Sequence, residues 1–123
     1  MSTAAAVAFP GQANVVKQTV GGQDRAFVLP PQISIGGGAA QVRSVQWING
    51  TGAKARFWFP NGDEVFVPPA GGDFSKPIEI LAGGLLTLQV KTPPNPGNYH
   101  YHVYCEAVKD CALGDSEPRV TVP

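Results

Sequence analysis

Short apolar runs, separated by glycine and proline about every ten residues, constrain the fold of this chain more than any other feature. Its 123 residues include 15 glycines and 12 prolines. Both residue types disfavour helix interiors, and no window of useful length repeats apolar residues at helical spacing. The pattern is typical of an all-β sandwich or barrel. The length suits a single domain over 1–123, in which we expect 1–12 to be a loose N-terminal segment.

The turn signals locate about eight strands. These are 13–20, 27–35, 41–49, 53–59, 78–81, 85–90, 99–105 and 119–122. Two prolines, Pro30 and Pro31, interrupt the second run, so we expect it to change sheet or to lie on an edge.

Two glycine-containing turns predict hairpins. Asn61-Gly62 readily adopts the positive φ of a tight turn, so it should join 57–60 to 65–67. Gly83-Gly84 should join the two runs on either side of it, and one helical turn is expected over 109–114.

The charge balance excludes several classes of partner. Nine basic and nine acidic residues cancel, and no basic stripe is present, so nucleic-acid binding is not expected. No run of about 18 apolar residues could span a bilayer, and no basic amphipathic helix suggests a membrane surface. The start lacks a basic n-region, so we expect a cytoplasmic chain as written, or a periplasmic or extracellular one if this is a mature exported form.

Three segments of the chain resemble the cupredoxins, the blue-copper β-sandwich proteins. The segment 45–51 reads Val-Gln-Trp-Ile-Asn-Gly-Thr, and 83–90 reads Gly-Gly-Leu-Leu-Thr-Leu-Gln-Val. The third, 97–105, reads Gly-Asn-Tyr-His-Tyr-His-Val-Tyr-Cys and is followed by a closing strand at 119–122. The resemblance implies a Greek-key β-sandwich whose type 1 copper is held by two imidazoles, a thiolate and a weak axial methionine.

Only Cys105 matches a copper-ligand position of that family. The region 53–56 and the loop 106–111 contain no histidine where the family has its two imidazole ligands, and the only methionine is Met1. We therefore predict a cupredoxin-like, non-catalytic binding or structural module that has no cofactor and no type 1 copper site. An enzyme is not expected, since no nucleophile with an orienting base is recognisable.

The histidines leave two interpretations open. His100 and His102 lie two apart on a strand and should share one face, so with Tyr104 on that face they could form a two-imidazole metal site. Alternatively both point to solvent while the alternate positions face the core. Those core positions are Tyr99, Tyr101, Val103 and Cys105.

The two cysteines, Cys105 and Cys111, are separated by five residues. They could form a local disulfide, remain free thiols, or act as a soft-metal pair. The alternative function is therefore an atypical copper-binding or electron-transfer protein that uses His100, His102, Cys105 and Cys111.

Three consecutive aromatic residues, Phe57, Trp58 and Phe59, place an aromatic ring on each face of their strand. If Phe57 and Phe59 lie inside, Trp58 lies outside next to Arg56. Trp58 and Arg56 could then anchor a protein or small-molecule partner, and Trp58 could stack on a sugar. Alternatively, sheet pairing or a homo-oligomer covers this tryptophan.

Overall fold

The structure, a computed structural model, describes residues 11–35, 44–69, 72–91, 94–112 and 118–122. Over these ranges it contains eleven strands and a single short 3-10 helix, so the all-β prediction is confirmed. There are more strands than the eight expected, because two of the predicted runs are split and β10 (Asp110–Cys111) is an extra one. No helix in these ranges is long and apolar enough to cross a bilayer.

The first sheet has the strand order β2-β1-β4-β7. Its strands are β1 (Gly11–Val20), β2 (Gln23–Leu29), β4 (Ser44–Gly50) and β7 (Leu85–Gln89). β1 and β4 are parallel, whereas β2 and β7 are antiparallel to their neighbours. Alternate residues such as Val15, Val45 and Trp47 are buried, as the period of two predicts for a sheet with one face in the core.

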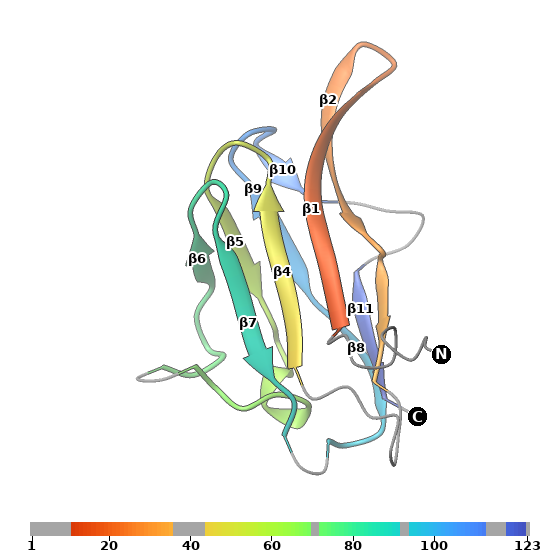
Figure 1. The fold of residues 1–123 in the computed structure, drawn as a ribbon, viewed down its shortest axis with the longest axis vertical. Helices are drawn as coiled ribbons and strands as arrows, with labels where there is room; N and C mark the ends of the chain where they lie inside the picture. Colours follow the sequence, from red (N-terminus) through yellow and green to blue (C-terminus); the bar gives the residue numbers. More distant parts are fainter. Residues whose placement is uncertain (1–10, 36–43, 70–71, 92–93, 113–117, 123) are drawn as a thin grey trace, which may run out of the picture.

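Two further sheets form the opposite layer (Figure 1). The second sheet, β10-β9-β5-β6, contains β5 (Ala55–Trp58), β6 (Ile78–Ile80) and β9 (His102–Cys105). The third, β3-β11-β8, contains β3 (Gln32–Ser34), β8 (Gly97–His100) and β11 (Arg119–Val122). The two are joined at Tyr101, whose N–H donates to the Pro118 carbonyl at 3.1 Å. The sequence predicted a change of sheet or an edge position at the two prolines, and β2 and β3 indeed lie in different sheets, each at an edge.

The hairpin predicted at Asn61-Gly62 is wrong. Residues Gly62–Glu64 form a 3-10 helix, and Asn61 has a φ of −121° rather than the positive value of a tight hairpin turn. Gly62 is buried so closely that an added Cβ would lie 2.6 Å from a ring carbon of Phe74. The chain therefore turns into the core here, and Phe66 bridges to Val90 instead of pairing with β5.

The second predicted hairpin, at Gly83-Gly84, is also wrong. β6 pairs with β5 and β7 pairs with β4, so the glycines lie in a connection between the two layers. Backbone bonds from Gly83 N–H to the Asn49 carbonyl (2.8 Å) and from Asn49 N–H to the Gly84 carbonyl (2.9 Å) hold this connection against the end of β4. The helical turn expected from residue 109 is replaced by strand β10, and residues 113 and 114 lie outside the described ranges.

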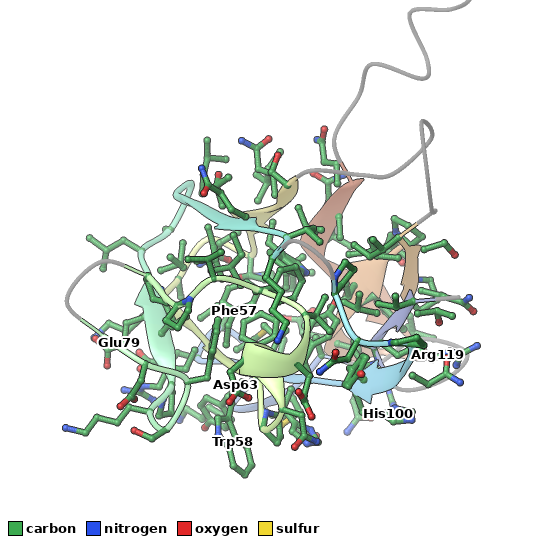
Figure 2. All side chains as sticks on the ribbon, turned by 90° about the horizontal axis from the view of Figure 1, so that it is seen from below. Phe57, Trp58, Asp63, Glu79, His100 and Arg119 are labelled. Carbon is green, nitrogen blue, oxygen red and sulfur yellow. The ribbon has the colours of Figure 1, made fainter. Side chains whose placement is uncertain are left out.

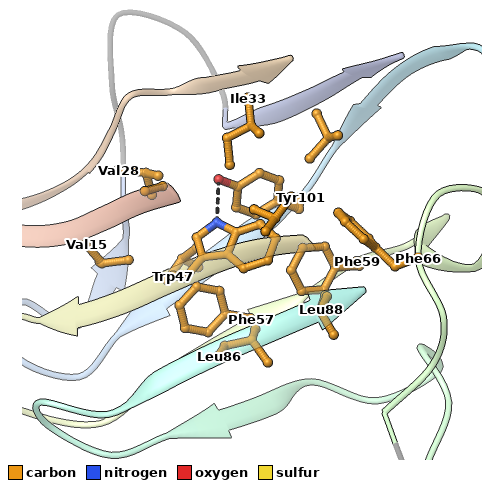
Figure 3. Close-up of a cluster of buried hydrophobic side chains, with 14 of the residues drawn as sticks. Val15, Val28, Ile33, Trp47, Phe57, Phe59, Phe66, Leu86, Leu88 and Tyr101 are labelled. Atoms are coloured by element: carbon orange, nitrogen blue, oxygen red, sulfur yellow. Dashed lines mark hydrogen bonds between the residues drawn. The ribbon is translucent and has the colours of Figure 1, made fainter. Parts of the chain in front are cut away.

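The core is organised around Trp47. Its indole projects from β4 into rings supplied by the opposite layer, with centroid distances of 5.2 Å to Phe59, 5.6 Å to Tyr101 and 6.1 Å to Phe57. Its Nε1–H donates to the Tyr101 hydroxyl at 2.9 Å, and both side chains are buried (Figure 3). This bond satisfies the only polar group of an indole deep in the sandwich.

Asn49 organises the end of the sandwich at which β4 stops. Its Nδ2 group donates to the carbonyls of Ala53 (2.8 Å), Ile80 (3.0 Å) and Leu81 (3.2 Å), and its Oδ1 accepts from the Thr51 hydroxyl (2.7 Å). One fully buried amide thereby ties the turn before β5 to the loop after β6.

Removal of the Tyr101 hydroxyl tests the bond across the core. Tyr101→Phe leaves the buried indole N–H without its acceptor and should lower the free energy of unfolding by about 1–3 kcal/mol. Urea unfolding measures this change. The control is Tyr104→Phe on the same layer, an exposed tyrosine whose change should stay within about 0.5 kcal/mol. Equal stability of the two variants would contradict the role of the bond.

Replacement of Asn49 tests the amide that joins the two loops. Asn49→Ala removes the donor to three part-buried carbonyls and the acceptor of the buried Thr51 hydroxyl, and it should lower the free energy of unfolding by about 2–4 kcal/mol in urea unfolding. Asn14→Ala is the matched control, because Asn14 is exposed on the outer face of β1. If Asn49→Ala lowers the free energy of unfolding no more than the control does, water replaces the amide without loss of stability.

Candidate functional site

The outer face of the second sheet brings together residues from four strands. One cross-strand row contains Glu79 of β6, Arg56 of β5, Tyr104 of β9 and Cys111 of β10, each paired with the next. The adjacent row pairs Trp58 with His102. Residues directly opposite each other in antiparallel strands share a face, so these side chains all lie on the side away from the core.

Trp58 is the most exposed aromatic residue of this face. Phe57 and Phe59 are buried, and Trp58 has 44% of its surface exposed, as the alternation predicts. Its ring lies 5.5 Å from that of His102, with an angle of 31° between the planes. Figure 2 shows the indole projecting away from the sandwich. His102 therefore packs beside the indole, and part of the ring remains open to solvent.

Arg56 is held between two carboxylates. Its Nε lies 3.2 Å from Glu79 Oε2, and its Nη2 lies 2.9 Å from Glu106 Oε2. Lys54 Nζ is 3.5 Å from the other oxygen of Glu79. The Arg56 hydrogen bond, with the nearby Lys54 charge, lowers the pKa of Glu79. Two cations, Lys54 and Arg56, thus face two carboxylates, Glu79 and Glu106, and the charges of these four side chains cancel.

A hollow of about 400 Å³ lies near the end of β5. Pro60, two residues beyond Trp58, forms part of its wall together with Asp63, Asp73 and Phe74. The Asp73 carboxylate accepts hydrogen bonds from the hydroxyl and the N–H of Ser75, and these bonds lower its pKa. A second hollow is lined by Pro77 and Ile78, and Ile78 pairs with Phe57 next to the tryptophan.

The two cysteines lie on opposite sides of the second sheet. Cys105 is fully buried, and it pairs with Asp110, whereas Cys111 pairs with the outward-facing Tyr104. Both are free thiols in this structure. Burial, with a contribution from the charge that Cys111 would carry, raises the pKa of the Cys105 thiol to about 11.

The histidines occupy two different sheets. His100 ends β8 and pairs with Arg119, whereas His102 begins β9 and contacts Trp58. Tyr101 and Val103, which alternate with them, are buried, so the predicted inward set is confirmed for these two and for Cys105, and Tyr99 packs partly against the core.

The four candidate metal ligands do not come together. In the described parts of the chain, no three His, Cys, Asp or Glu side chains form a group that could hold a metal ion. His102 and Cys111 share the outer face of the second sheet, but Cys105 points to the opposite side.

The donor set does not fit a type 1 copper ion. Such a site needs a thiolate and two imidazoles, and Cys105 is a buried thiol whose raised pKa disfavours the thiolate. Where the cupredoxin resemblance implies a first histidine, β5 begins with Ala55, which is buried and directly opposite Cys105. Beyond Cys105, the chain turns through Glu106 towards β10 and offers no imidazole.

The sequence alone did not reveal the partners of Trp58 and Arg56. Alternation predicts that His102 and Tyr104 share an outward face, but the pairing of β5 with β9 joins segments more than 40 residues apart. The Glu79 and Glu106 contacts depend on the same long-range pairing. The one local signal was the run Arg56 to Phe59, whose alternation correctly places Trp58 outside.

Comparison with known proteins identifies the fold. No protein-family model matches the chain, and no significant match was found among curated proteins. Among solved structures, a multicopper oxidase from Campylobacter jejuni, a metallo-oxidase, is 16% identical over 94% of this chain and 26% of that chain, with a TM-score of 0.54. A purple cupredoxin from Nitrosopumilus maritimus is 17% identical over 92% of this chain and 99% of that chain, with a TM-score of 0.48.

An amicyanin variant in its reduced Cu(I) form is 16% identical over 93% of this chain and 82% of that chain, with a TM-score of 0.47. Identities this low carry information on the fold alone. The arrangement of the sheets and the similarity to the multicopper oxidase agree with the sequence segments around Trp47 and Cys105. The chain therefore has a cupredoxin-like β-sandwich fold.

Proposed function

We propose that this chain is a non-catalytic binding module on a cupredoxin-like fold, without a type 1 copper site. The observation that carries the proposal is the state of Cys105, the one residue at a copper-ligand position. It is fully buried opposite Ala55, and burial raises its thiol pKa to about 11. Cysteine in such a place acts as a small apolar group that packs the core.

The binding surface of the module is the outer face of β5 and β9. Trp58, Tyr104 and Arg56 belong to the residue types that contribute most to recognition surfaces. All three stand on strands of one sheet, so their positions are fixed before a partner arrives. We place the partner contact here because this face combines exposed aromatic rings with a fixed set of charges.

Addition of Cu(II) to the metal-free protein tests the absence of a type 1 site. We expect weak, colourless binding with no intense visible charge-transfer band, because a blue site requires a copper-bound thiolate. Cys105→Ser should leave the copper content unchanged, and Cys111→Ser serves as its control. Stoichiometric copper with an intense visible band that disappears only in Cys105→Ser would overturn the proposal in favour of an atypical electron-transfer protein.

Thiol counting tests the state of the cysteines and bears on the compartment. The register places the two sulfurs on opposite sides of the sheet, so we expect two thiols per denatured chain, both with and without reductant. In the native protein Cys105 should react far more slowly than Cys111, because it is buried and resists ionisation. Thiols that appear only after reduction would instead show a disulfide and an oxidising compartment.

A further inference from the structure

We propose that the outer face of β5 and β9 binds a neutral carbohydrate chain, with Trp58 as the stacking platform. This inference rests on the proposed function and specifies the ligand class of the same face. Three independent features support it: the geometry of the indole, the compensated charges next to it, and the hollow beside it.

The first feature is a flat ring that is both exposed and held in place. Trp58 is 44% exposed, and the neighbouring His102 ring lies at 5.5 Å. Sugar rings present faces of C–H groups that pack against aromatic planes, and indole combines a large apolar face with one polar N–H. A ring fixed on a strand loses little conformational freedom on binding. Tyr104, diagonally across from Trp58, adds a second exposed ring with a hydroxyl.

The second feature is the charge balance around the platform. Arg56 contacts both Glu79 and Glu106, and Lys54 contacts Glu79. An anionic ligand would have to compete with these carboxylates for the guanidinium, whereas sugar hydroxyls can add to both the donors and the acceptors. A protein partner, including a second copy of this chain, would cover four charged residues, and the cores of protein interfaces are depleted in charge.

The third feature is the hollow next to the platform. It begins at Pro60, and its polar wall contains Asp63, Asp73 and Ser75. Carboxylate and hydroxyl oxygens at such a position can accept hydrogen bonds from sugar hydroxyls, while the apolar wall contacts the ring. A platform followed by a polar hollow suits a chain of several sugar units better than a single sugar.

The test uses the whole chain and four soluble probes: cellohexaose, chitohexaose, laminarihexaose and maltohexaose. Calorimetric titration measures binding, and the two tryptophans provide a second signal. Trp47 is buried, so acrylamide should quench mainly Trp58, and a bound sugar should protect it. In Trp58→Phe only the buried tryptophan remains, so the protection should disappear.

We expect at least one probe to bind, and Trp58→Ala to weaken that binding about tenfold or more. The matched control is Leu85→Ala, which removes an exposed apolar side chain from the outer face of the first sheet and should leave the affinity unchanged. Both positions are exposed, so both variants should unfold close to the parent protein, which urea unfolding verifies.

Three results would overturn the inference. Binding that Leu85→Ala weakens as much as Trp58→Ala would place the ligand elsewhere. Tighter binding of heparin or polygalacturonate than of every neutral probe would show an anion site. Self-association that Trp58→Ala abolishes, with no bound sugar, would assign this face to a second copy, and the proposed binding module would still stand. The absence of a type 1 copper site is tested separately, and copper bound at Cys105 would overturn it whatever the sugar titrations show.

Discussion

The contact between Trp47 and Tyr101 is the interaction on which the rest of the sandwich depends. The indole reaches from β4 across the core, and the tyrosine stands where β8 passes into β9. One hydrogen bond therefore joins the first sheet to the junction of the other two. The rings of Phe57 and Phe59 pack edge-on around the same indole, so the position of β5 depends on it as well. Because β5 carries Trp58 on its outer side, the central packing also sets the position of Trp58.

At the end of the sandwich to which the cupredoxin resemblance assigns copper, both a polar and a thiol side chain are buried. Asn49 bonds to the carbonyls of both neighbouring connections, and Cys105 packs against the core opposite Ala55. A buried amide with several partners can hold loops together as a metal does, although each bond adds far less free energy. Within the described residues, the scaffold of the fold is present, and no three His, Cys, Asp or Glu side chains gather where they could hold a metal ion.

The outer face of β5 and β9 results from strand pairing rather than from any local motif. Trp58 gains its support from His102, and Arg56 gains its carboxylates from β6 and from the turn after β9. These residues are neighbours only because β5 lies between β6 and β9. The sheet therefore presents an exposed aromatic ring next to a group of paired charges, and both are held by strand pairing.

The sequence alone determined the all-β class and the inward set at Tyr101, Val103 and Cys105. It also predicted a change of sheet or an edge position at Pro30, and an outward Trp58 if Phe57 and Phe59 lie inside. These follow from local rules: a period of two along a strand and the backbone limits of glycine and proline. The tertiary structure decided what local rules cannot. Asn61-Gly62 turns into the core because Gly62 packs against Phe74, and Gly83-Gly84 crosses between layers because β6 and β7 find different partners. Strand pairing depends on contacts between distant segments, so no short window of the sequence contains it.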